Sequence, residues 1–132
     1  MKIFKKMKDG GPESTVTGYW LIEIKWLISI VLLKFEGKSR EAFHNHAFNC
    51  YNWLLKGKLT EHLMSGKIRE YKPSIFGFVI TKDDFHKVDS DETSWLISIR
   101  GPWSKRWKEY HPNTNTLHTL TNGRVIVESQ PQ

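Results

Sequence analysis

The sequence predicts an all-β sandwich or barrel, and three features carry this prediction. Short apolar segments alternate with clusters of Gly, Pro, Asn and Asp, which are typical of turns between strands. Ile and Val are frequent in these segments, and their branched side chains pack well on a pleated surface. No segment shows a sustained helical period of apolar residues. Short strands with this punctuation indicate an all-β domain.

Length and composition are those of one self-supporting globular domain. The chain has 132 residues, of which 39% are hydrophobic, and it contains six Trp and seven Phe. A disordered chain has few aromatic residues and little apolar surface to bury. Residues 1–18 carry charge and show no periodicity, so we expect them to form a flexible basic N-terminal segment. Residues 19–128 then form the β domain.

The cysteine content and the hydropathy of the chain bear on its compartment. A single cysteine, Cys50, excludes an internal disulfide and fits a reducing environment. The basic N-terminus, MKIFKKMKDGG, has no apolar segment behind it. The longest apolar run, residues 26–33, is far shorter than the ~20 residues that a membrane-spanning helix needs. We therefore expect a cytoplasmic protein that does not enter a membrane.

The first predicted strand covers residues 19–35, where apolar residues alternate with polar ones. Trp20, Ile22 and the isoleucines that follow at even positions are expected to share one face. This length is unusual for one strand, so we expect a bend or bulge near Lys25 and Trp26. Further strands are predicted at residues 43–57, 59–64, 68–71, 75–80, 85–88 and 93–100, around Trp107, and at 125–127 after a hairpin turn at Asn122 and Gly123.

Two histidines lie one residue apart in the segment FHNHAFNCYNWLLKG, residues 43–57. Because side chains alternate across a strand, His44, His46, Cys50 and Asn52 should face the same way. His86 begins a predicted strand about forty residues later, and an antiparallel barrel brings such distant strands side by side. Three neutral imidazoles suit Zn, Fe, Ni, Cu or Mn and leave coordination positions open. The alternative is that the histidines form hydrogen bonds at a polar barrel mouth.

The spacing around this pair resembles the first motif of the cupin superfamily. That motif runs from a glycine through His-x-His and a glutamate to a second glycine. All of its residues except the glutamate are present, namely Gly37, His44, His46 and Gly57. Cys50 stands at the place of the glutamate. The second cupin motif, compared with residues 81–90, is matched only at His86. The resemblance covers residues 19–127, and its order also resembles small uncharacterised cupin-like proteins common in bacteriophage genomes.

The resemblance implies a small jelly-roll barrel in which His44, His46 and His86 bind a divalent transition metal, namely Fe, Zn, Ni or Mn. Cys50 is then an additional ligand, a pocket residue or a small buried hydrophobe. A thiolate ligand would shift the metal preference towards Zn or Cu and would close an open position. A homodimer through the N-terminal strands is implied as well, and the apolar length of residues 19–35 is consistent with it.

Two further residues are candidates for substrate binding. Arg100 closes a predicted core strand at the barrel mouth, where a guanidinium can hold a carboxylate or phosphate bidentately. The alternative for Arg100 is a surface ion pair with Glu92 or Asp91. Asn52 lies beside the histidine motif, where it either contacts a substrate or satisfies a strand edge.

These features predict a metal-dependent enzyme that acts on a small polar or anionic substrate. The alternative is a non-catalytic module that sequesters a small anionic ligand such as a nucleotide. If the chain is encoded by a bacteriophage, this module would serve counter-defence in the cytoplasm of the host cell. An assay for turnover separates the two functions, because the module returns its ligand unchanged.

A third prediction rests on the net charge of +6. In residues 103–110, cations alternate with aromatic residues, which is compatible with contacts to a single-stranded nucleic acid. A half-buried edge strand produces the same alternation, and we favour this structural interpretation over nucleic-acid binding.

Overall fold

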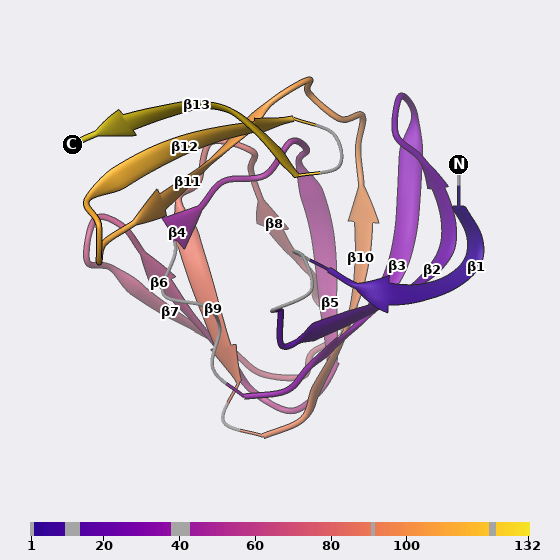
Figure 1. The fold of residues 1–132 in the computed structure, drawn as a ribbon. Coiled ribbons are helices and arrows are strands. Elements are labelled where there is room, and N and C mark those ends of the chain that lie inside the picture. The colour runs from indigo at the N-terminus through magenta and orange to yellow at the C-terminus, as the bar shows by residue number, and fades with distance from the viewer. Residues whose placement is uncertain (1, 10–13, 38–42, 91, 122–123) are drawn as a thin grey trace.

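The structure is a computed structural model that describes residues 2–9, 14–37, 43–90, 92–121 and 124–132. Within these ranges the strands form two antiparallel sheets and no helix is present (Figure 1). The described residues therefore include no helix with the length and apolarity needed to cross a membrane. The all-β prediction is confirmed, but the two sheets are not closed into a barrel.

One sheet has six strands in the order β1 (Lys2–Lys8), β2 (Val16–Ile24), β3 (Ile28–Phe35), β10 (Ser94–Arg100), β5 (Cys50–Lys56) and β8 (Phe78–Ile80). The other has seven strands in the order β13 (Val125–Pro131), β12 (Thr116–Thr121), β11 (Trp107–His111), β4 (Phe43–His44), β9 (His86–Ser90), β6 (Leu59–Leu63) and β7 (Ile68–Tyr71). The strand β12 was not among the sequence-based predictions, and the predicted turn at Asn122 and Gly123 lies outside the described residues.

Part of the N-terminal segment predicted to be loose is a strand. Lys2–Lys8 pairs with β2 in an antiparallel register, and β2 itself begins at Val16. The segment lacks a hydrophobic period because β1 lies at the edge of its sheet and exposes most of its side chains, including Phe4. The six-stranded sheet therefore includes most of the described residues before residue 19.

Residues 19–35 form a hairpin rather than one bent strand. A tight turn at residues 25–27, in which the Leu27 amide donates to the Ile24 carbonyl over 2.9 Å, separates β2 from β3. The position of the break was predicted correctly, but its kind was wrong. Trp26 is 77% exposed at this turn. The turn was not predicted because it contains none of the usual turn residues and lies within an apolar run.

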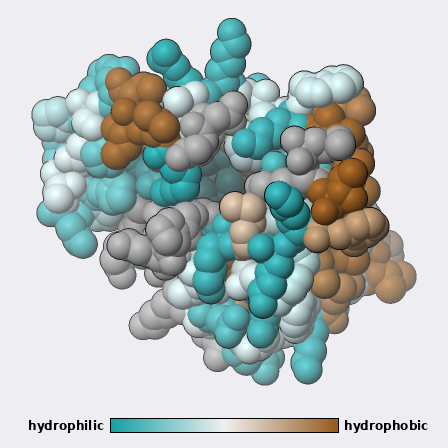
Figure 2. Space-filling model, turned by 45° about the vertical axis from the view of Figure 1, so that its right-hand side comes forward, coloured by the Kyte–Doolittle hydropathy of each residue, from teal (hydrophilic) through white to brown (hydrophobic). Residues whose placement is uncertain are grey.

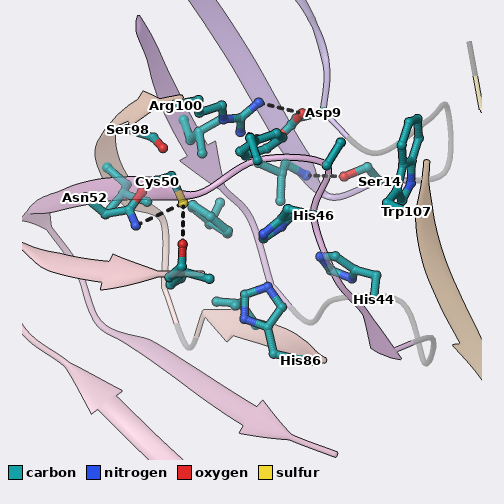
Figure 3. Close-up of a pocket in the computed structure, with 18 of the residues that line it drawn as sticks. Asp9, Ser14, His44, His46, Cys50, Asn52, His86, Ser98, Arg100 and Trp107 are labelled. Atoms are coloured by element: carbon teal, nitrogen blue, oxygen red, sulfur yellow. Dashed lines mark hydrogen bonds and ion pairs between the residues drawn. The ribbon is translucent and has the colours of Figure 1, made fainter. Parts of the chain in front are cut away.

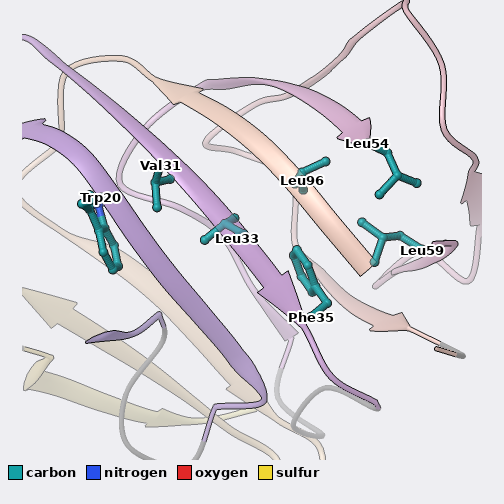
Figure 4. Packing of buried hydrophobic residues seen from close by; sticks show 7 residues of the cluster. All are labelled: Trp20, Val31, Leu33, Phe35, Leu54, Leu59 and Leu96. Atoms are coloured by element: carbon teal, nitrogen blue, oxygen red, sulfur yellow. The ribbon is translucent and has the colours of Figure 1, made fainter. Parts of the chain in front are cut away.

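The hairpin turn and a register shift between Trp20 and Ile22 also change which side chains face the core. The predicted common face of the even positions is therefore wrong, because Trp20 is buried, whereas Ile28 is exposed and Ile30 is only half-buried. In β3 the buried positions are the odd ones. The main core cluster, shown in Figure 4, consists of Trp20, Val31, Leu33, Phe35, Leu54, Leu59 and Leu96.

The central strand β10 turns its more apolar face away from the core. Its buried positions alternate through Ser94, Leu96, Ser98 and Arg100, while the Trp and Ile residues between them are half-buried on the outer face. Outward-facing apolar side chains continue on neighbouring strands. Figure 2, which brings the side of β1–β3 forward, shows apolar residues gathered at the surface. This arrangement places Arg100 between the two sheets.

Residues 43–57 do not form one strand. β4 ends at His44 in the seven-stranded sheet, and β5 begins at Cys50 in the six-stranded sheet, so residues 45–49 cross from one sheet to the other. Asparagine side chains satisfy the backbone at this crossing. Asn45 Oδ1 accepts from the Lys108 amide over 2.6 Å, and Asn49 Oδ1 accepts from the Lys82 amide over 2.7 Å. Such side-chain bonds replace a strand ladder.

Candidate metal centre

Three histidines from the two halves of the sequence meet between the sheets. His44 ends β4, His46 lies in the crossing, and His86 begins β9, where it pairs directly with His44. The ring centroids are 5.0 Å apart for His44 and His46, 5.0 Å for His44 and His86, and 4.9 Å for His46 and His86. One ring nitrogen from each residue lies within 4.8 Å of the others. Figure 3 shows the three rings around one space.

His46 is held in the form that binds metal. Its burial, together with the nearby His86, His44 and Arg100, lowers the pKa of His46 well below its usual value. The ring therefore stays neutral, and a neutral imidazole is the ligating species. One face stacks on Phe48 with 5.0 Å between the ring centroids. The Nδ1 atom of His46 is buried and has no hydrogen-bond partner.

His86 is supported from behind by a buried carboxylate. Its Nδ1 atom lies 2.5 Å from Oε2 of Glu61, and both side chains are almost fully buried. Oε1 of Glu61 accepts from the Tyr71 hydroxyl over 2.9 Å. Burial alone would raise the pKa of Glu61, but the hydrogen bonds from His86 and Tyr71 hold it below its usual value. The remaining ring nitrogen of His86, Nε2, is left for the shared space.

Cys50 lies in the pocket wall and is not part of the histidine group. The ligand atoms that lie within 4.8 Å of one another belong to the three histidines, and Sγ of Cys50 is not among them. The thiol lies 3.7 Å from the carbonyl of Ile80 and accepts from Nδ2 of Asn52 over 3.4 Å. Burial raises the pKa of the Cys50 thiol, although the Asn52 hydrogen bond opposes this. Cys50 therefore has the environment of a neutral buried thiol.

The histidines line a cavity of about 400 Å³ between the sheets. This volume lies within the usual range for small-molecule sites. Aromatic side chains contribute to its wall, among them Trp20, Phe48, Trp103 and Trp107. Trp103 and Trp107 belong to the segment in which cations alternate with aromatic residues. These two rings pack against the cluster around Phe48, whereas the cations between them at positions 105 and 106 are exposed.

Arg100 also lines the cavity, but its charge has an internal partner. Its Nη2 donates to Oδ2 of Asp9 over 2.8 Å, so the ion pair is formed with Asp9 rather than with Glu92, and the other expected partner, Asp91, lies outside the described residues. The guanidinium carbon lies 4.6 Å from the ring centroid of Phe48. Burial opposes protonation, yet the Asp9 carboxylate raises the pKa of Arg100, so the side chain stays charged. Its Nε atom is buried without a partner.

Asn52 is buried, and its side chain is engaged by the protein. Besides its bond to Cys50, its Nδ2 lies 3.4 Å from the carbonyl oxygen of Phe78, so both contacts stabilise the wall of the cavity. Asn52 lines the cavity together with Arg100, so the structure brings both predicted substrate-binding candidates to the same space as the three histidines.

Sequence reasoning assigned no definite role to Glu61 or Asp9. A signal was present, because Glu61 shares its strand parity with the buried Leu59, so a carboxylate occupies an inward position. No such signal exists for Asp9, since its contact with Arg100 joins residues 91 positions apart in the sequence.

The donor set fits a divalent transition metal. Three imidazoles converge, His46 is kept neutral, and His86 has Nδ1 engaged so that Nε2 is available. The orphaned buried nitrogen of His46 also indicates that the protein alone does not satisfy this site. Three-histidine sites bind Zn, Fe, Ni or Mn and retain open coordination positions.

Comparison with solved structures identifies similar folds. A sugar phosphate isomerase of the cupin superfamily from Silicibacter pomeroyi aligns with a TM-score of 0.64 and 9% identity, over 100% of this chain and 93% of that one. The polyketide cyclase RemF from Streptomyces resistomycificus has a TM-score of 0.61 and 15% identity, over 74% of this chain and 73% of its own. KdgF from Halomonas sp. has a TM-score of 0.57 and 18% identity, over 76% and 94%.

No protein-family model matches the sequence, and no curated protein matches it either. The structural likeness nevertheless extends over the whole chain, and the resemblance of the histidine motif agrees with it. The chain therefore has the jelly-roll fold of the cupins.

Proposed function

We propose that this protein is a metal-dependent enzyme that acts on a small polar or anionic substrate in the cavity between its sheets. The observation that supports this is the convergence of His44, His46 and His86 at the wall of a cavity of about 400 Å³. A divalent cation held there supplies Lewis acidity and lowers the pKa of a bound water.

The protein's own residues have separate roles in binding the cation, excluding water and contacting the substrate. The three imidazoles would hold the cation at the wall of the cavity. Phe48 and Trp103, whose ring centroids are 5.1 Å apart, exclude water from the adjoining wall and offer apolar contact to a substrate. Arg100 supplies a buried positive charge in this wall, and its Nε is the donor that a polar substrate group can engage.

Metal content tests this proposal directly. Purified protein is expected to contain close to one Fe, Zn, Ni or Mn per chain by elemental analysis, and anomalous scattering from a crystal should place the ion among the three histidines. Protein that is metal-free, and stays so after incubation with each of these ions, would contradict the proposal.

A non-catalytic module for a small anionic ligand is the alternative. Its anion would bind at Arg100, which is buried in the cavity wall as such a site requires. The ion pair between Arg100 and Asp9 favours a polar substrate over such an anion, because an anionic ligand must share or displace the Asp9 carboxylate. Incubation of a nucleotide with the metal-loaded protein, followed by mass spectrometry, separates sequestration from turnover.

We also infer a homodimer formed through the outer face of the six-stranded sheet, an interface wider than the N-terminal strands β1–β3 of the sequence-based prediction, which belong to this sheet. Exposed apolar residues lie on this face, including the cross-strand neighbours Tyr51 and Val79, which are 42% and 54% exposed. Replacing both with Glu should convert dimers into monomers in sedimentation experiments, because burying unpaired carboxylates costs several kcal/mol. Val127→Glu is the matched control, since Val127 is 45% exposed on the other sheet. Dissociation by the control alone would refute this interface.

A further inference from the structure

We propose that Glu61 is a positioning residue of the metal centre, which selects the tautomer and orientation of His86. This inference deepens the proposed function and rests on it for its consequence in metal binding. The effect of Glu61 on the tautomer of His86 applies to the protein without metal and can be tested there. Glu61 lies outside the histidine group, so it acts through His86 rather than as a ligand.

The strand register brings the two side chains together. Glu61 pairs with Val88 across β6 and β9, and His86 precedes Val88 by two positions, so Glu61 and His86 are diagonal neighbours on one face. The 2.5 Å separation of Oε2 and Nδ1 leaves room for one shared hydrogen and for no water. An ionised carboxylate is an acceptor, so Nδ1 of His86 is the donor and Nε2 carries the lone pair.

Glu61 is itself held in place from its other side. The Tyr71 hydroxyl donates to Oε1 over 2.9 Å, and Arg69 lies 3.7 Å from the same oxygen. The ring of Tyr71 stacks on Phe78 with 3.8 Å between centroids, which fixes its hydroxyl. Burial and the charge of Glu61 raise the pKa of Tyr71 to about 12, so Tyr71 remains a donor. The chain of contacts from Tyr71 through Glu61 to His86 is therefore complete.

The negative charge of Glu61 is important because the histidine group itself includes no carboxylate. Three neutral imidazoles leave the charge of a divalent cation uncompensated, and Cys50 is a neutral thiol at the place where the cupin motif has glutamate. Glu61 supplies one negative charge behind His86 and orients that ligand through its contact with Nδ1. The carboxylate thus acts from outside the ligand set.

The substitution Glu61→Gln tests the inference in two independent ways. In metal-free protein, nitrogen NMR of the His86 ring at alkaline pH should show the Nδ1–H tautomer, and the variant should shift the population towards Nε2–H. In the loaded protein, the dissociation constant for Zn²⁺ or Co²⁺ should rise by about 10- to 100-fold, the range found when outer partners of metal ligands are removed. Tyr71→Phe should raise it less.

Glu70→Gln is the matched control, because Glu70 lies on the adjacent strand β7 with its side chain 55% exposed. It should change neither measurement, and thermal melting should show that all variants are folded. An unchanged His86 tautomer in Glu61→Leu, which has no acceptor atom at this position, would overturn the positioning role. A shifted tautomer in a protein that binds no metal would instead leave the positioning role intact and refute the proposed metal-dependent function.

Discussion

Replacing His46 with Ala should abolish tight metal binding. The variant removes one of three converging nitrogens, so the dissociation constant for Zn²⁺ should rise by more than the ~100-fold effect of losing an outer partner. In calorimetric melts, metal at 100 times its dissociation constant should stabilise the wild-type protein by about 2.7 kcal/mol. The same metal concentration should leave the melting temperature of the variant unchanged.

The metal-free form of His46→Ala should remain folded, because the ring contributes a buried Nδ1 without a partner as well as its stack on Phe48. His62→Ala is the matched control. His62 lies outside the histidine group and forms a half-exposed contact with Asp89 at 3.2 Å, so its removal should not affect metal binding. Tight one-to-one binding by His46→Ala, or its loss in His62→Ala, would place the metal elsewhere.

Replacing Gly57 with Ala should destabilise the protein by about 3 kcal/mol in denaturant titrations. Gly57 has φ of +92°, a left-handed conformation that costs a residue with a Cβ atom about 1–2 kcal/mol. The added Cβ would also lie 2.7 Å from Cα of Ser94, a backbone atom of the central strand. Relieving this overlap requires a backbone shift, and overpacking of this kind adds about 1–3 kcal/mol.

Gly66→Ala separates the two contributions. Gly66 has φ of +95°, but a Cβ atom there would meet nothing within 4 Å. Its substitution should therefore cost only the conformational part, about 1–2 kcal/mol. Equal losses of unfolding free energy in the two variants would show that the overlap with Ser94 adds no cost at position 57.

Local patterns predicted the elements whose signals lie within a few residues. The strands β6, β7 and β10 and the turn at residues 64–66 follow the alternation of side chains and the turn residues between them. Alternation does not, however, say which face is buried. On β10 the more apolar face points outward, because the opposite sheet covers the face that carries Ser98 and Arg100.

The approach of His44 to His46 was predicted from strand parity, but the strand does not continue through His46. The rings meet because the chain crosses between sheets at residues 45–49 and because β4 pairs with β9 at His86. The cupin motif predicted the histidine group even though the parity argument failed. Its residues span both strands and the crossing between them, so the motif does not depend on one continuous strand.

By itself, the sequence determined the all-β class, most strand positions and the grouping of the three histidines. Each of these depends on side-chain periodicity or on a short motif. The tertiary structure alone decided the contacts of those residues with distant ones. It placed Cys50 in a hydrogen-bonded wall, Asp9 on Arg100 and Glu61 behind His86. These contacts depend on the register of strands far apart in the sequence, and no local pattern specifies that register.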